Sequence, residues 1–132
     1  MDKLEISQKY RGYIDCLNQR DWSRLSIFVS EQARYNGEMI GLSGYIRMLE
    51  RDTAAIPDLV FKIDFLVADP PSIGARLLFN CTPTGELFGL AVDGRRVTFT
   101  ENVFYRFEGD RIESVWSVID QAAVRLQLQD IA

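Results

Sequence analysis

The chain has 132 residues, of which 47% are apolar and 26% charged, which is typical of one soluble globular domain and leads us to expect a single domain over residues 1–132. Its net charge is −4 with scattered basic residues, so nucleic acid is not an expected partner, and no apolar run is long enough to span a membrane. Histidine is absent, which excludes Ser-His-Asp, Cys-His and zinc-hydrolase chemistry and leaves acid–base work to carboxylates, tyrosines or lysines.

The first half of the chain has the pattern of helices. Residues 4–17 carry apolar groups at helical spacing, and Asp21 is placed to cap a short second helix. A short extended segment over residues 33–36 follows, after which Ser43 could cap a third helix. Pro57 closes this section, because the residue before a proline resists the helical conformation.

The second half changes to a period of two, which indicates strands. Turn signals at 69–72, 93–94 and 108–110 separate expected strands at 59–67, 73–81, 96–107 and 111–120, and residues 121–129 predict a last helix. One face of the first strand should carry Leu59, Phe61, Ile63, Phe65 and Val67. Helices followed by strands predict an α+β fold, with a curved antiparallel sheet, helices on its concave face and a cavity between the two.

Glu101 is the candidate acid–base residue. It is the one polar group on an otherwise apolar face of the strand 96–107, where burial would raise its pKa toward neutrality. A tight turn at 108–110 would pair Glu101 with Ser117 on the following strand. Alternatively, Glu101 lies on an outward face or bonds an arginine, because a slip of one residue moves a side chain to the other side of a sheet.

Short segments along the chain occur in a characteristic order. They are Asn18-Gln19-Arg20-Asp21-Trp22, Tyr35-Asn36-Gly37, Gly41-Leu42-Ser43-Gly44-Tyr45, Ile56-Pro57-Asp58-Leu59, Gly94-Arg95-Arg96-Val97, Tyr105-Arg106-Phe107 and the run from Trp116 to Asp120. In this order and spacing, the chain from about Tyr10 to Gln129 resembles the SnoaL-like polyketide cyclases, or predicted ester cyclases, of the nuclear transport factor 2-like superfamily.

The resemblance implies a cone-shaped α+β barrel, usually dimeric, with one deep apolar pocket for a small apolar molecule. The best-known members close a ring of an aromatic polyketide ester by an intramolecular aldol reaction, without a metal or a cofactor. The charged start of the chain lacks the apolar stretch of a signal peptide, and its two cysteines lie far apart, so we expect a cytoplasmic protein without a disulfide.

The resemblance transfers to single positions only in part. The early-strand asparagine of the aldol cyclases matches Asn36, and their long-strand glutamine is replaced by Glu101. Val103 stands in place of their histidine, and Ser117 in place of their acid–base aspartate. The carboxylate could therefore have moved across the hairpin to Glu101, or the aldol activity could be lost.

Each other candidate has two interpretations. Asn36 could bond a substrate oxygen or settle a turn, and Asp120 could be a site residue or cap the last helix. Trp116 could be a ligand wall or packing. Tyr10 and Tyr13 could be core residues or offer hydroxyls to a carbonyl ligand.

Three classes of function follow. The first is a cofactor-free enzyme that moves a proton on a small carbonyl compound, with Glu101 as base or acid and Asn36 and Ser117 as hydrogen-bond donors. The second opens epoxides with activated water and requires two carboxylates bridged by an arginine, for which the sequence offers only Glu101 and Asp120 with Arg76 or Arg96. The third is a non-catalytic domain that binds a ligand or dimerises.

Overall fold

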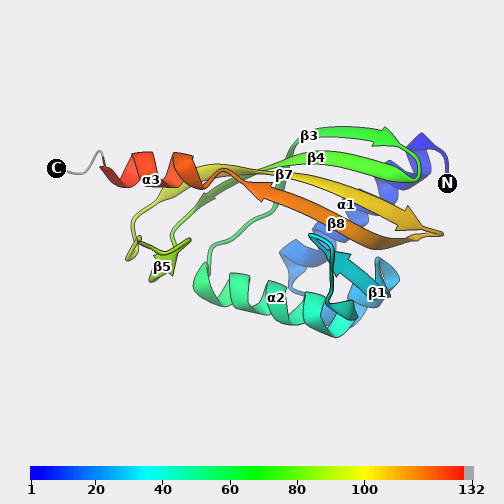
Figure 1. Cartoon of the computed structure of the whole chain (residues 1–132), viewed down its shortest axis with the longest axis horizontal. Coiled ribbons are helices and arrows are strands. Elements are labelled where there is room, and N and C mark those ends of the chain that lie inside the picture. Colours follow the sequence, from blue (N-terminus) through cyan, green and yellow to red (C-terminus); the bar gives the residue numbers. More distant parts are fainter. Residues whose placement is uncertain (130–132) are drawn as a thin grey trace.

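The computed structural model describes residues 1–129, so the last three positions of the expected domain, 130–132, lie outside the described residues. Short loops connect the elements along the chain (Figure 1). In order they are α1 (Lys3–Gln19), the 3-10 helix η1 (Trp22–Ile27), β1 (Val29–Tyr35), β2 (Glu38–Met39), α2 (Gly41–Ala55), β3 (Lys62–Asp69), β4 (Ser72–Cys81), β5 (Glu86–Leu87), β6 (Leu90–Ala91), β7 (Val97–Glu108), β8 (Arg111–Ile119) and α3 (Gln121–Gln129).

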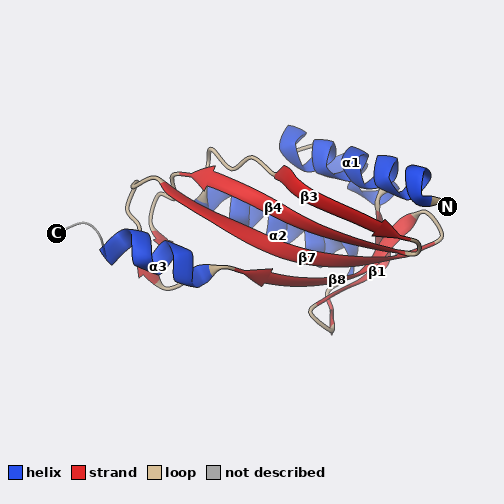
Figure 2. Cartoon of the chain, turned by 90° about the horizontal axis from the view of Figure 1, so that it is seen from above, coloured by secondary structure: helices blue, strands red, loops and turns tan. Residues whose placement is uncertain are grey.

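A curved sheet of six strands, in the order β2-β1-β8-β7-β4-β3, forms one layer of the molecule. Neighbouring strands are antiparallel except β1 and β8, which pair in parallel. The α+β prediction is confirmed, but across the described residues the sheet does not close into a barrel, because β2 and β3 remain at its edges. Figure 2 shows α1 beside β3 and α2 beyond the sheet.

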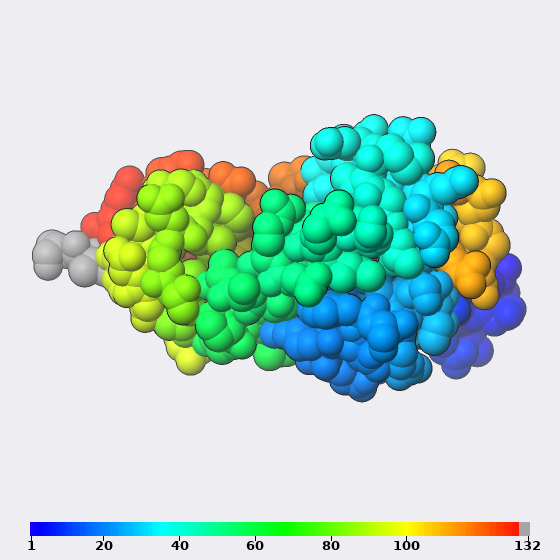
Figure 3. Space-filling view, turned by 90° about the horizontal axis from the view of Figure 1, so that it is seen from below, coloured from blue at the N-terminus to red at the C-terminus, as the bar shows by residue number. Residues whose placement is uncertain are grey.

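The helices α1, η1 and α2 and the β5–β6 hairpin form the second layer, whereas α3 extends beyond the end of the sheet (Figure 1). Seen from below, α2, η1 and this hairpin cover the sheet (Figure 3). The helix α1 begins with a capping box in which Asp2 and Glu5 bond each other's backbone, and its apolar stripe is buried as the periodicity predicted. The core that fills the space between the layers is entirely apolar or aromatic among the described residues.

Two of the expected caps are not present. The Asp21 side chain caps no backbone N–H of η1 and instead accepts a hydrogen bond from the side-chain Oγ of Ser23 at 2.8 Å. Ser43 lies inside α2, which begins two residues earlier at Gly41. The chain reverses at Gly41 with a φ of 66°, a conformation that glycine adopts without strain, so the turn and not a side-chain cap sets this helix start.

The face predicted for the first strand holds only for its first half. Leu59 and Phe61 are buried, but Phe65 and Val67 are 62% and 50% exposed. The cause is a register shift between Ile63 and Phe65 against β4, which reverses the alternation from there on. The following strand is buried along Ile73, Ala75, Leu77, Phe79 and Cys81, as its alternation indicated.

The expected pairing of Glu101 with Ser117 is wrong. The hairpin pairs Glu108 with Arg111, and a second register shift follows Arg106, so Glu101 stands opposite Ile119 and Ser117 opposite Val103. The turn pairing and the shift after Arg106 each displace the two strands by one residue, which makes a total displacement of two residues. Because side chains alternate between the faces of a sheet, a displacement of two residues leaves Glu101 and Ser117 on the same face as diagonal neighbours.

Candidate functional site

Two adjoining cavities lie between the sheet and α2, with volumes of about 40 and about 90 Å³. Both are lined by Tyr35, Asp52, Phe61 and Glu101, which makes these residues the boundary between the two spaces. Tyrosines dominate the smaller cavity, and phenylalanines the larger: the further lining includes Tyr13, Tyr45, Leu77, Val103 and Tyr105 in the first, and Phe79, Leu87, Phe88, Phe99 and Ile119 in the second. We refer to them as the tyrosine cavity and the phenylalanine cavity.

Glu101 projects from the middle of β7 into this space. Ser117 Oγ donates a hydrogen bond to Glu101 Oε2, and among residues 1–129 no arginine or lysine forms an ion pair with this carboxylate. Burial raises the pKa of Glu101, the Ser117 hydrogen bond opposes this, and the negative charge of Asp52 adds to the rise. Glu101 is therefore a carboxyl group whose protonated form is favoured by its surroundings.

Asp52 is a second carboxylate at the cavities, and it was not among the residues predicted from the sequence. It lies near the end of α2 and lines both cavities, while part of the residue remains exposed to solvent. Partial burial raises the pKa of Asp52 to about 6, against the opposing charge of Arg51. One signal was available: Tyr45, Leu49 and Asp52 follow the i, i+4, i+7 spacing of a helix face directed at the core.

The five tyrosines of the chain gather around the two carboxylates. The hydroxyls of Tyr13 and Tyr45 lie 2.7 Å apart, and Tyr10 donates to Tyr105 at 3.0 Å. Burial raises the pKa of all four of these phenols, and Glu101 adds to the rise. The hydroxyls consequently stay protonated at neutral pH and can act as hydrogen-bond donors.

Asn36 positions Ser117 and lies outside both cavities. It occupies the left-handed region with a φ of 49°, its backbone amide donates to Val115 O at 2.8 Å, and its Oδ1 accepts the backbone N–H of Ser117 at 2.9 Å. Because Ser117 in turn donates to Glu101, Asn36 is tied to the carboxylate through the serine. Asn36 is exposed and stabilises the turn after β1, which agrees with a structural role in the turn and not with a substrate contact.

The remaining predicted residues divide into two groups. Tyr13 and Val103 line the tyrosine cavity, and Tyr10 is fully buried behind it. Trp116 does not form a ligand wall, because the register shift in the hairpin leaves it 46% exposed on the opposite face of the sheet. Asp120 is likewise outside, and its Oδ1 accepts the backbone N–H of Ala123 at 3.1 Å, as a cap of α3.

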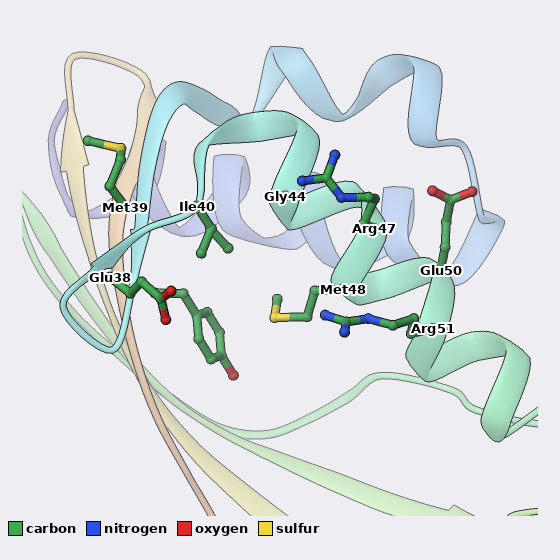
Figure 4. A pocket seen from close by; sticks show the side chains of 9 residues that line it. Glu38, Met39, Ile40, Gly44, Arg47, Met48, Glu50 and Arg51 are labelled. Atoms are coloured by element: carbon green, nitrogen blue, oxygen red, sulfur yellow. The ribbon is translucent and has the colours of Figure 1, made fainter.

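A wider groove of about 750 Å³ lies on the outside between the β1–β2 turn and α2 (Figure 4). It shares Tyr35 and Met48 with the lining of the tyrosine cavity, so the groove and the cavity adjoin. Arg51 extends from α2 into the groove, toward Met48 (Figure 4). Tyr35 and Met48 therefore stand between this outer groove and the tyrosine cavity.

Other features of the described chain bear on the class of protein. Within residues 1–129 there is no group of three or more acidic, cysteine or histidine residues able to hold a metal ion. Both cysteines are buried and free. No helix in this part of the chain has the length and apolarity needed to cross a membrane.

The curved sheet and the covering helices define an α+β domain with two small internal cavities that Glu101 borders. The family profile described as SnoaL-like polyketide cyclase matches residues 7–128. A SnoaL-like polyketide cyclase from Agrobacterium tumefaciens is 44% identical, with 97% of this chain and 99% of that chain covered and a TM-score of 0.93. The chain belongs to the SnoaL-like polyketide cyclase family.

More distant structures share the fold alone. TsrD from Streptomyces laurentii is 21% identical with a TM-score of 0.85 and 97% of both chains covered. AclR from Streptomyces galilaeus is 19% identical with a TM-score of 0.79, covering 99% of this chain and 100% of that one. A comparison with curated protein sequences finds no match.

Proposed function

We propose that Glu101 is the acid–base residue of a cofactor-free reaction at the carbon next to a carbonyl group, in a small and largely apolar compound. The observation that carries this proposal is the place of Glu101: a carboxyl group without a cationic partner in the described chain, raised in pKa by burial and lining both cavities. Membership of the SnoaL-like family supports a cyclase-type role. The reaction would be a cyclisation, an isomerisation or a dehydration through an enol or enolate.

The surroundings of Glu101 supply what such a reaction requires. A negative charge that develops on a carbonyl oxygen is stabilised by hydrogen-bond donors fixed in advance, and the tyrosine hydroxyls that border the tyrosine cavity are donors of this kind. The phenylalanine cavity would hold the apolar part of the ligand. Both volumes are far below the roughly 300–1,000 Å³ of typical ligand pockets, which favours a molecule of one ring or a short chain.

The epoxide-opening alternative has little support from the arginines. Arg76 Nε donates to Asn102 at 3.1 Å, and Arg96 donates to Asn80 at 2.9 Å, in both cases through exposed side chains away from the cavities. Asp120 caps α3. The arginine bridge between two carboxylates that this chemistry requires is therefore not formed by these residues.

Deuterium exchange at the carbon next to the carbonyl tests the proposal directly. The native protein should accelerate the exchange of cyclohexanone or acetophenone in heavy water, followed by proton NMR. Glu101→Gln should lower the rate by on the order of 100-fold or more, because a positioned acid–base group contributes about that much. Glu108→Gln is the matched control, since it makes the same change on the same strand at an exposed position.

The alternative function is ligand binding without chemistry. In that case the ketones would shift the NMR signals of cavity residues but would not exchange faster than in buffer. Equal exchange rates in native protein and Glu101→Gln would contradict the enzymatic proposal. The same cavity could still serve as the binding site.

We also propose that the chain forms a homodimer through the outward face of its sheet. Large apolar side chains are exposed there: Phe65, Val67, Phe104, Trp116 and Val118. Phe104 stands opposite Trp116 on β8 and Gly74 on β4, and Gly74 stands opposite Val67 on β3, so the patch continues across four strands. Contiguous apolar surface of this kind commonly marks an interface.

A further inference from the structure

Asp52 and Glu101 are carboxylates from different layers of the molecule that border the same two cavities. Glu101 comes from the centre of the sheet and Asp52 from the last turns of α2. Both line the tyrosine cavity and the phenylalanine cavity, so a ligand that occupies either one lies beside both residues. Within residues 1–129 neither carboxylate forms an ion pair.

We propose that Asp52 is the second acid–base residue of the site, with Asp52 as the base and Glu101 as the acid. This inference rests on the proposed function and assigns its two roles. The two carboxylates lie at different depths. Asp52 borders the cavities from an exposed position, whereas Glu101 lies on the covered face of the sheet beneath α2. Desolvation disfavours the charged form, so the deeper carboxyl group keeps its proton when the outer one has lost it.

The charges around Asp52 and Glu101 support an ionised Asp52 beside a protonated Glu101. With a pKa of about 6, Asp52 is mostly ionised at pH 7, and its charge then favours the protonated form of Glu101. Burial raises the pKa of Asp52, and the positive charge of Arg51, beside it on α2, opposes this rise. The other titratable groups near Glu101 are phenols that stay neutral: Tyr10 and Tyr13 on α1, Tyr35 on β1, Tyr45 on α2 and Tyr105 on β7.

The chemical step is balanced without a further reactant. The Asp52 carboxylate takes a proton from the carbon next to the carbonyl, and the C–H electron pair becomes the C=C bond of an enol. The carbonyl π pair forms the new O–H bond with the proton that Glu101 gives up. For a ketone with a C=C bond between its β and γ carbons, Asp52 then returns its proton to the γ carbon, where the π pair of that C=C bond forms the new C–H bond. The enol C=C pair moves between the α and β carbons, the O–H pair re-forms the carbonyl and the Glu101 carboxylate recovers the enol proton, which completes an isomerisation and restores both residues.

Carboxyl-carbon NMR of labelled protein tests the pairing without any substrate. The pKa of Glu101 should be lower in Asp52→Asn than in the native protein, whereas that of Asp52 should change little in Glu101→Gln, because Glu101 is still protonated and neutral while Asp52 titrates. Asp15→Asn, the same change at an exposed position of α1, controls for the loss of one negative charge anywhere on the molecule. An unchanged Glu101 titration in Asp52→Asn would overturn the pairing.

The ketone exchange assay then tests the roles. Asp52→Asn should lose on the order of 100-fold or more in exchange rate, Asp52→Glu should recover part of it, and Asp15→Asn should match the native protein. Full activity in Asp52→Asn with activity lost in Glu101→Gln would overturn the role of Asp52 and leave the proposed function standing. No acceleration by the native protein would overturn both.

Discussion

The hydroxyl pair between Tyr13 and Tyr45 gives a sharp test of how the site wall is held together. The two rings come from α1 and α2, are 3% and 2% exposed, and their hydroxyls lie 2.7 Å apart. In the described chain neither hydroxyl has another hydrogen-bond partner. Tyr13→Phe keeps the ring and removes one oxygen, which leaves the Tyr45 hydroxyl buried and unsatisfied.

The expected loss follows from that unsatisfied group. A buried polar group without its partner costs about 1–3 kcal/mol, so each single variant, Tyr13→Phe or Tyr45→Phe, should lose about 2 kcal/mol of unfolding free energy. The double variant removes both polar groups from an apolar site and should lose about 1 kcal/mol or less. For 132 residues and an unfolding entropy of about 2.1 cal/mol/K per residue, 2 kcal/mol corresponds to about 7 °C in Tm.

Urea unfolding of the native protein, both single variants and the double variant at pH 7 measures this cycle. We expect the double variant to be more stable than either single variant, because only the single variants leave a buried hydroxyl without a partner. A double variant that loses about 4 kcal/mol, the sum of the two, would refute it. In that case each hydroxyl would be satisfied separately, for example by water in the adjoining cavity.

Three further predictions concern charge, the turn after β1 and assembly. The pKa of Asp52 is higher in the folded state than its ordinary value of 3.8, so the native state binds more protons and stability falls as pH rises from about 4 through about 6. In urea titrations, the change in unfolding free energy across this pH window should therefore be about 1 kcal/mol smaller for Asp52→Asn than for the native protein. This value allows for the screening of Asp52 by solvent. Asn36→Ala should lose about 1–2 kcal/mol in the same assay and raise the titration midpoint of Glu101, because it loosens the Ser117 hydrogen bond that holds the pKa of Glu101 down, whereas an unchanged stability would contradict its anchoring role. Phe104→Glu should convert a dimer to a monomer in sedimentation at micromolar concentration, and a native protein that sediments as a monomer would exclude the proposed interface.

Much of the fold could be predicted because periodicity reports which face of an element is buried. The α1 stripe and the β4 alternation both gave the correct buried residues. The failures occur where one extra residue enters a strand. The register shift before Phe65 reversed the predicted face of β3, and no residue there has a distinctive bulge pattern that would have signalled it.

The predicted face of Glu101 was correct although its predicted partner on the next strand was wrong. The face of a strand depends only on whether a displacement is odd or even, and the hairpin contains two displacements of one residue each. Trp116 lies on the partner strand β8, and its face was undecided because the count of residues from the turn to Trp116 passes through the register shift. Side-chain alternation is thus a reliable guide to a face up to the first bulge and no further.

Asp52 was harder to find because its role depends on tertiary position. A carboxylate three residues after a buried leucine on a helix is ordinary, and most such residues face solvent. What distinguishes Asp52 is the stretch of sheet that α2 crosses, where Glu101 comes up from the other layer. No spacing within either segment encodes that meeting, since it arises from the packing of one layer on the other. The second carboxylate of the site is therefore visible only in the assembled fold.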